Sequence, residues 1–218
     1  MAIKAVIFDF DGVIADTDSM WHGSIAEFMG KRNIELTEED YENIVGKTFS
    51  NKFQILKEKY GLDGDYDEFH NNTHIAATKK IAGELPLNPG VKELINSLEE
   101  MGIILAIASA NSKKNIHLIT DKFNLTDKFS VMVDIHDVTE HKPSPAVYLK
   151  TAEKLGIAPN ECVAVEDTQL GVESAKNAEM KAIAVPGKFS KGQDFSRADL
   201  MVESLEEIDV EKIISLGE

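Results

Sequence analysis

Short apolar runs recur along the chain and predict β-strands. They are rich in β-branched residues and nearly continuous, a pattern typical of strands buried on both faces of a parallel sheet. The predicted strands cover residues 5–8, 103–107, 131–133, 163–165, 182–185 and 200–202. Stretches with a helical period lie between several of them, such as Val91, Leu94, Ile95, Leu98 and Met101. This alternation of strand and helix predicts an α/β fold with a doubly wound, Rossmann-like parallel sheet.

One long interval, from Asp16 to Gly83, interrupts the alternation. It contains helical patterns and turn signals but no convincing strand, and Thr37 followed by Asp40 is typical of a helix start. The interval is too long for an ordinary connection between the first two strands. We therefore expect residues 16–83 to form a small helical domain inserted into a core of residues 1–15 and 84–218.

The last part of the chain carries a second helix-start signal. Ser204 followed by Glu207 has the spacing of a capping box, and it precedes the final apolar residues of the chain. We expect this pair to begin the last helix.

The composition of the chain says more about its binding partners than about its fold. Apolar residues make up 43% and charged residues 28% of the 218 residues, which is typical of a globular protein. Lys and Arg total 23 against 38 Asp and Glu, so the formal net charge is −15. Such acidity argues against a nucleic acid or an anionic membrane surface as the main partner. We expect a monomer or a weak homo-oligomer.

The cysteine content and the hydropathy of the chain indicate its cellular compartment. The single cysteine, Cys162, cannot form an internal disulfide, which fits a reducing compartment. No segment approaches 18 uninterrupted apolar residues, and the N-terminus lacks the pattern of a signal peptide. We expect a mature cytoplasmic protein without a membrane span.

Two carboxylates directly follow the first predicted strand, in Asp9-Phe10-Asp11-Gly12. Ligands bind at the carboxyl ends of strands in a doubly wound sheet, and two carboxylates there could divide phosphoryl transfer between a nucleophile and a proton shuttle. Alone, the motif fits an acidic turn better than a catalytic site. A calcium-binding EF-hand loop is excluded, because Met20 stands where the loop needs glutamate.

Three further polar positions fall at predicted strand ends or helix starts. Ser109 follows the second strand, Lys142 precedes a predicted helix, and Glu166-Asp167 ends the fourth strand. A hydroxyl at a helix start and a lysine can both bind phosphate. Each has a plainer interpretation by itself: a helix cap for Ser109 and for the acidic pair, and a solvated surface residue for Lys142.

The four positions occur in a fixed order, and together they resemble the motifs of the haloacid dehalogenase superfamily. Those motifs are D-x-D-G, a Ser or Thr after a strand, a Lys near K-P, and a terminal E-D. The helical insert resembles the small C1-type cap of that family, and the P-G-V-x-x-L stretch after Pro86 is also similar. The pattern is most similar to a subgroup that contains phosphatases of small metabolites and β-phosphoglucomutase.

The resemblance implies a catalytic role for four residues. Asp9 would be the nucleophile and Asp11 the general acid and base, while Ser109 and Lys142 would hold the phosphoryl group. Because dehalogenases of this family need neither a second aspartate nor a metal, the presence of Asp11 favours phosphate chemistry.

The resemblance also implies a Mg²⁺ cofactor. Asp9, Asp167 and the backbone carbonyl of Asp11 would bind the ion, and Glu166 would support it through a water molecule. Mg²⁺ prefers oxygen ligands, and clustered carboxylates beside a phosphate need a cation to remain ionised. The cation and Lys142 would thus let an acidic protein accept an anionic substrate.

Substrate selectivity is expected to come from the cap and from the loop after the second strand. The residues expected to bind substrate are Ser109, Ala110, Asn111, Lys142, Lys47, Trp21 and His22. Trp21 fits the packed core of the cap equally well, and Asn111 fits a helix cap.

Two departures from the family pattern bear on these expectations. Phe49 stands where the mutases have an arginine for a second phosphate, which weakens a mutase assignment. Glu179 stands where a glycine usually ends a helix. A left-handed C-cap costs a glutamate about 1 kcal/mol more than a glycine, so we expect this helix to end differently.

The sequence therefore predicts a Mg²⁺-dependent phosphatase that hydrolyses a small phosphorylated metabolite through an aspartyl phosphate. The main alternative is a β-phosphoglucomutase-like phosphosugar mutase. A phosphonate hydrolase that uses a cap lysine such as Lys47, and a non-catalytic binding module, are the remaining alternatives.

Overall fold

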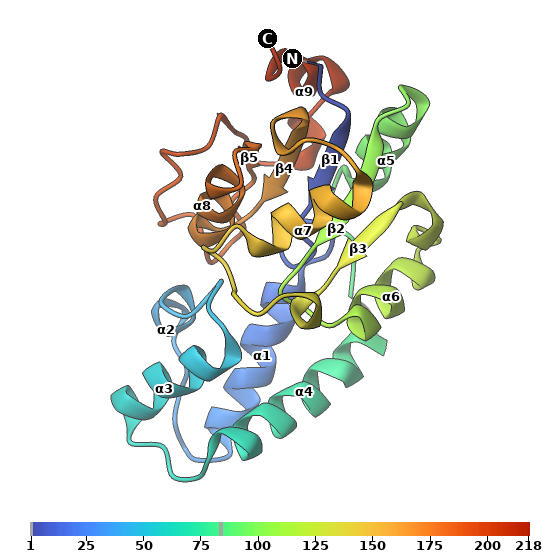
Figure 1. Ribbon diagram of the computed structural model, residues 1–218. Coiled ribbons are helices and arrows are strands. Elements are labelled where there is room, and N and C mark those ends of the chain that lie inside the picture. The colour runs from blue at the N-terminus through green and yellow to red at the C-terminus, as the bar shows by residue number, and fades with distance from the viewer. Residues whose placement is uncertain (1, 83–84) are drawn as a thin grey trace. The chain divides into compact units, whose positions relative to one another are not determined.

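The computed structural model describes residues 2–82 and 85–218, and the chain divides into two compact units (Figure 1). The core unit comprises Met1–Ala15 and Leu87–Glu218, and the insert unit comprises Asp16–Pro86. The domain boundary predicted between residues 83 and 84 lies outside the described residues.

The core unit is built on a parallel sheet. Its strands are β1 (Ala5–Phe8), β2 (Ile104–Ala108), β3 (Val131–Val133), β4 (Cys162–Glu166), β5 (Lys181–Ala184) and β6 (Leu200–Met201). They pair in the order β3-β2-β1-β4-β5-β6, and every pairing is parallel. The strand order reverses at β1 and β4, which is the switch point of a doubly wound fold. The predicted fold class is confirmed.

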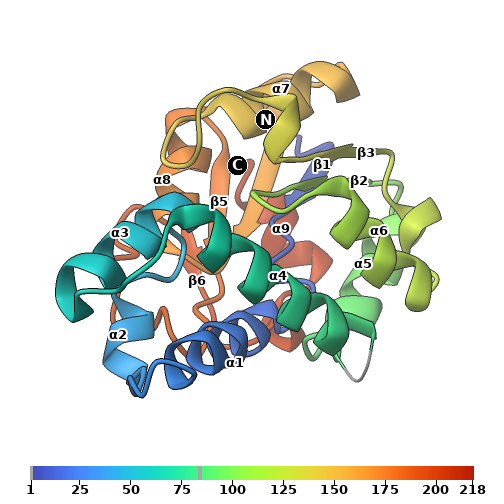
Figure 2. The same cartoon turned by 90° about the horizontal axis from the view of Figure 1, so that it is seen from below.

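Helices cover both faces of this sheet. They are α5 (Val91–Glu100), α6 (Lys113–Lys122), α7 (Ala146–Leu155), α8 (Gln169–Asn177) and α9 (Val210–Ser215). Short 3₁₀ turns are η1 (Thr126–Lys128), η2 (Ile135–Asp137), η3 (Pro159–Glu161) and η4 (Leu205–Glu207). Seen from below, α7 and α8 lie on one face of the sheet and α5, α6 and α9 on the other (Figure 2).

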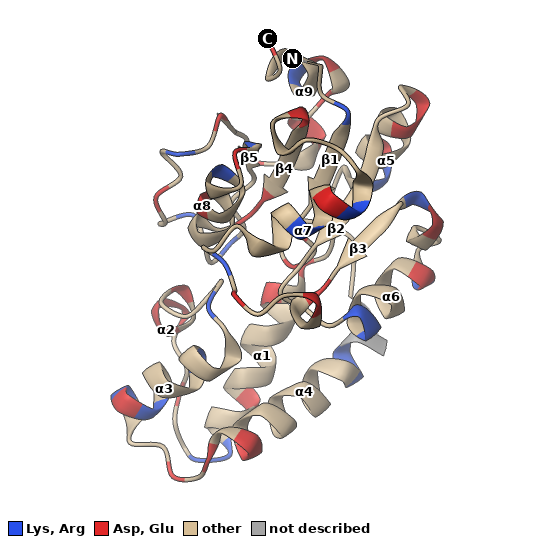
Figure 3. Cartoon of the chain, viewed as in Figure 1, with Lys and Arg blue, Asp and Glu red and all other residues tan. Residues whose placement is uncertain are grey.

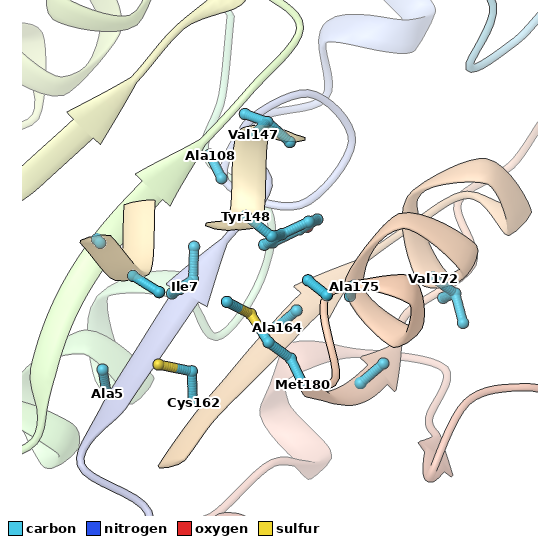
Figure 4. Close-up of a cluster of buried hydrophobic side chains, with 14 of the residues drawn as sticks. Ala5, Ile7, Ala108, Val147, Tyr148, Cys162, Ala164, Val172, Ala175 and Met180 are labelled. Atoms are coloured by element: carbon cyan, nitrogen blue, oxygen red, sulfur yellow. The ribbon is translucent and has the colours of Figure 1, made fainter. Parts of the chain in front are cut away.

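Small side chains on one face of the sheet let α7 and α8 pack closely. Alternate strand positions on this face carry Ala5 and Ile7 in β1, Ala106 and Ala108 in β2, Cys162 and Ala164 in β4, and Ala182 and Ala184 in β5. The space above these alanines is filled by larger residues of the helices, notably Tyr148 of α7 (Figure 4). Close packing of this kind fixes α7 relative to the strand ends.

The regular secondary structure in the described part of the insert unit is helical. It contains α1 (Thr17–Gly30), α2 (Glu38–Glu42), α3 (Phe49–Tyr60) and α4 (Tyr66–Ala82), with no strand among residues 16–82 and 85–86. Helices α1 and α4 pack together, and α3 also contacts α4. The predicted helix start is confirmed, because Thr37 and Asp40 form a capping box at α2.

Two predictions about helix ends are wrong. Ser204 caps the 3₁₀ turn η4 and accepts a hydrogen bond from the amide of Glu206, two residues on, so the chain turns too tightly for an α-helix. The last helix, α9, instead begins after Asp209, whose side chain accepts from the amide of Lys212. Glu179 does adopt the left-handed conformation, with φ of 63°, and thus ends α8 without a glycine.

Charged residues occur in both units, and none of the described helices is strongly apolar over a long stretch. Acidic and basic residues are interspersed on the helices and loops of both units (Figure 3). Within residues 2–82 and 85–218, no helix combines the length and the apolar character needed to cross a membrane.

Candidate active site

Asp9 lies at the switch point of the sheet, where β1 ends beside β4. Its backbone amide donates to the carbonyl of Val165 at 2.9 Å, so the ladder between β1 and β4 continues one residue past the strand. Asp9 is 6% exposed, and the next residue, Phe10, is fully buried. A rigid sheet therefore positions the predicted nucleophile.

Lys142 joins the ends of β1 and β4. Its ammonium group donates to Asp9 Oδ1 at 2.6 Å and to Glu166 Oε1 at 2.5 Å. Burial alone lowers the pKa of Lys142, but the two carboxylates outweigh it, so the pKa lies above its ordinary value. Lys142 is thus a permanent cation at the site, and it is not a solvated surface lysine.

Asp11 faces a different set of partners. Its Oδ2 accepts from the hydroxyl of Ser109 at 3.2 Å, and its Oδ1 accepts from the side-chain amide of Asn111 at 2.9 Å. The Ser109 hydroxyl in turn accepts from the backbone amide of Asn111 at 2.9 Å. The N-cap position of α6 is occupied by Ser112, so neither Ser109 nor Asn111 serves as its cap. The exposed Ala110 lies between these two residues.

Three carboxylates form a cluster that could hold a metal ion. Asp9, Glu166 and Asp167 each offer an oxygen, and these oxygens lie within 4.8 Å of one another. Glu166 is fully buried, and its Oε2 has no hydrogen-bond partner among the described residues. Burial raises the pKa of Asp9 well above its ordinary value, and Glu166 and Asp11 raise it further against the opposing effect of Lys142. The oxygen donors, the orphaned oxygen and the concentrated negative charge all fit a divalent cation.

Two glycines make room for this cluster. A Cβ atom on Gly12 would lie 2.1 Å from Asp167 Oδ2, and Gly12 also has a φ of +75° that favours glycine. A Cβ atom on Gly171 would lie 1.9 Å from Glu166 Oε2. The N-cap of α8 is Thr168, so the acidic pair before it is not needed as a helix cap.

The other predicted binding residues belong to the insert unit. Trp21 is 5% exposed and packs edge-on against the rings of Phe49 and His74. The His22 ring packs edge-on against Tyr41. Lys47 is half-buried in the turn before α3. Phe49 is thus part of an aromatic cluster with Trp21 and His74.

Tyr148 and Gly171 lie at the site although the sequence did not point to them. The Tyr148 hydroxyl donates to Glu166 Oε1 at 2.5 Å from within the hydrophobic core. Burial and the negative charge of Glu166 raise the pKa of Tyr148 well above its ordinary value, so the hydroxyl remains protonated. The only sequence signal was a polar atom on the apolar face of a helix, which periodicity does not distinguish from an ordinary core tyrosine.

A family model matches most of the chain, and two relatives match it along nearly their whole length. The model of the family described as haloacid dehalogenase-like hydrolase matches residues 6–185. Protein CbbY of Rhodobacter capsulatus is 32% identical over 94% of this chain and 95% of its own length. The putative phosphatase YhcW of Bacillus subtilis is 31% identical over 95% of this chain and 94% of its own length.

A solved structure has the same fold over nearly the whole chain. It is CbbY from Rhodobacter sphaeroides in complex with xylulose-(1,5)bisphosphate. Its TM-score is 0.82 with 26% sequence identity, and the match covers 94% of this chain and 96% of that one.

Proposed function

The chain belongs to the haloacid dehalogenase-like hydrolase family and is a phosphoric monoester hydrolase, and on that premise we propose that it is a Mg²⁺-dependent phosphatase of a small phosphorylated metabolite. The observation that carries the proposal is that the two carboxylates after β1 have different hydrogen-bond partners. Asp9 is paired with the cation Lys142, whereas Asp11 is held by the neutral donors Ser109 and Asn111.

These environments suit two different roles. In the first half-reaction, a carboxylate oxygen of Asp9 bonds to phosphorus while the bond from phosphorus to the ester oxygen breaks. Asp11 gives its proton to that leaving oxygen, and the product is an aspartyl phosphate on Asp9. In the second half-reaction, Asp11 takes a proton from water, the water oxygen bonds to phosphorus, and the bond to Asp9 breaks to release inorganic phosphate.

The remaining residues hold charge and orientation. The Lys142 ammonium neutralises phosphoryl oxygens, and the Ser109 hydroxyl donates to one of them. Asp9, Asp167 and the backbone carbonyl of Asp11 would bind Mg²⁺, with Glu166 supporting the ion through water. Bound there, Mg²⁺ supplies positive charge that keeps Asp9 ionised and offsets the charge of the phosphate.

We propose that residues 16–83 act as a cap that selects the substrate. Lys47, Trp21 and His22 would contact it from the cap, and Ala110 and Asn111 from the loop after β2. A sugar phosphate is the favoured substrate class, because the similar CbbY structure contains a sugar bisphosphate. The single buried thiol supports a cytoplasmic location, and the net charge of −15 supports a small ligand over a polyanion.

The test measures inorganic phosphate released by the purified chain from sugar phosphates, phosphoglycolate, nucleotides and phosphonates in the presence of Mg²⁺. We expect Asp9→Asn to abolish turnover, and EDTA to do so reversibly, with activity restored by added Mg²⁺. Asp63→Asn, which changes an exposed aspartate of the insert unit, is the matched control and is expected to keep full activity. Full activity of Asp9→Asn or of the EDTA-treated enzyme would overturn the proposal.

The same experiment separates the alternatives. A mutase would interconvert isomeric sugar phosphates without steady release of phosphate. A phosphonate hydrolase would be trapped by borohydride with an aldehyde substrate at a lysine such as Lys47. A binding module would hydrolyse nothing across the panel.

A further inference from the structure

Tyr148 places a polar group inside the hydrophobic core next to the candidate active site. Its side chain is fully buried and lies among Ile7, Ala164 and Ala175 (Figure 4). The ring fits the space that the small strand residues leave, so packing alone would be satisfied by phenylalanine. A hydroxyl in such a place must have a partner, and its partner is Glu166 at 2.5 Å.

The hydroxyl is the first member of a chain of contacts that ends at the proposed nucleophile. Glu166 Oε1 accepts from Tyr148 and from the ammonium of Lys142, both at 2.5 Å. Lys142 also donates to Asp9 Oδ1 at 2.6 Å, and its ammonium lies 5.3 Å from the centroid of the Tyr148 ring. Tyr148 therefore contacts both members of the buried ion pair, one through its hydroxyl and one through its ring.

Few hydrogen bonds fix the orientation of the Glu166 carboxylate. Both hydrogen bonds described for its side chain are made to Oε1, while Oε2 faces the space left by Gly171. With Lys142 alone, the carboxylate could rotate and exchange its two oxygens. The second donor fixes the carboxylate plane, so that Oε1 stays with Lys142 and Oε2 remains available to the metal cluster.

We propose that Tyr148 is a positioning residue that fixes the rotation of Glu166 and, through it, the Lys142 ammonium and the metal cluster. The inference rests on the Mg²⁺ site of the proposed function, and its kinetic test rests on the proposed phosphatase activity as well. Binding of Mg²⁺ to the chain without substrate tests the inference separately from turnover.

The experiment compares Tyr148→Phe with the wild-type protein. This substitution keeps the ring and removes only the hydroxyl. We expect Mg²⁺ affinity, measured by calorimetry without substrate, to fall about tenfold, and kcat to fall about tenfold, as is typical when a partner that orients a metal ligand is lost. KM is expected to change less than about twofold, because the phosphate-contacting groups remain present.

Tyr60→Phe is the matched control. The Tyr60 hydroxyl also donates to a carboxylate, Asp40 Oδ2, at 2.5 Å, but within the insert unit. We expect this variant to keep the Mg²⁺ affinity and kcat of the wild-type protein, whatever its effect on stability.

The outcomes separate the two proposals. If Tyr148→Phe kept the Mg²⁺ affinity and kcat of the wild-type protein, the positioning role would be overturned. A variant that only lost stability or failed to fold would also overturn it, because the hydroxyl would then be purely structural. A wild-type protein that binds Mg²⁺ but hydrolyses no ester would overturn the proposed function, while calorimetry would still decide the role of Tyr148. If neither protein bound Mg²⁺, both proposals would fall.

Discussion

Asn111 donates a hydrogen bond from its side-chain amide to Oδ1 of Asp11 at 2.9 Å, although the two residues are 100 positions apart in the sequence. The contact fixes the carboxylate that we propose as proton shuttle. We expect Asn111→Ala to lower kcat/KM about tenfold, because a hydrogen bond to a charged group contributes about 1.5 kcal/mol or more. Steady-state kinetics with the best substrate of the panel measures this.

The control for this prediction is Asn72→Ala. The Asn72 amide donates to the carbonyl of Glu68 on the exposed side of α4. Its removal is expected to leave kcat/KM unchanged. Equal activities of both variants would contradict the role of Asn111.

Gly171 is expected to tolerate no side chain, because a Cβ atom there would lie 1.9 Å from Glu166 Oε2. Gly171→Ala must displace the buried carboxylate, so we expect at least a tenfold loss of kcat and a lower melting temperature, since overpacking typically costs about 1–3 kcal/mol. Gly30→Ala is the comparison, because a Cβ atom on Gly30 would meet no other atom within 4 Å. Alanine is expected to be neutral or stabilising there. A fully active Gly171→Ala would show that Glu166 has freedom to move.

The buried position of His74 predicts that the stability of the folded protein depends on pH. Burial among aromatic rings, together with the nearby charge of His70, lowers the pKa of His74 from 6.5 to about 4 in the folded protein. Its Nε2 is buried and has no hydrogen-bond partner among the described residues. The unfolded chain therefore binds more protons between these two values, so the contribution of His74 is fully present above pH 6.5 and is lost as the pH falls toward 4.

The measurement is the free energy of unfolding by denaturant at several pH values. We expect His74→Phe, which keeps an aromatic ring but does not titrate, to show a smaller decrease in stability over this range than the wild-type protein. His141→Gln, at an exposed loop position, is expected to follow the wild-type curve. Parallel curves for His74→Phe and the wild-type protein would contradict the prediction.

Cys162 is expected to be chemically inert in the folded protein. Burial in β4, with a smaller effect of Glu161, raises the pKa of its thiol from 9.0 to about 11, and its side chain is fully buried. Thiolate is the reactive form, so alkylation near neutral pH should be very slow before unfolding and complete in denaturant. Rapid labelling of the native protein, followed by mass spectrometry, would contradict the packing of β4.

Sequence patterns predicted the structure correctly where it depends on residues that are close together in the chain. The continuous apolar runs predicted the parallel strands because strands buried on both faces leave few polar positions. Thr37 and Asp40 predicted the start of α2 because a capping box is made within three residues. The same reasoning was wrong at Ser204, where the hydroxyl bonds to the amide two residues on, and at Glu179, where the chain ends α8 in a left-handed conformation despite its cost.

By itself, the sequence determined the doubly wound core, the helical insert and the order of Asp9, Ser109, Lys142 and Asp167 along the chain, because apolar periodicity and motif spacing are properties of contiguous residues. The tertiary structure alone decided which of these groups meet. Strand order places the ends of β1 and β4 side by side, so Asp9 and Glu166 share one lysine although they stand 157 positions apart in the printed sequence. The tertiary structure also decided that a core tyrosine, Tyr148, contacts that pair. A contact between distant elements depends on how they pack, so no periodic sequence pattern predicts it.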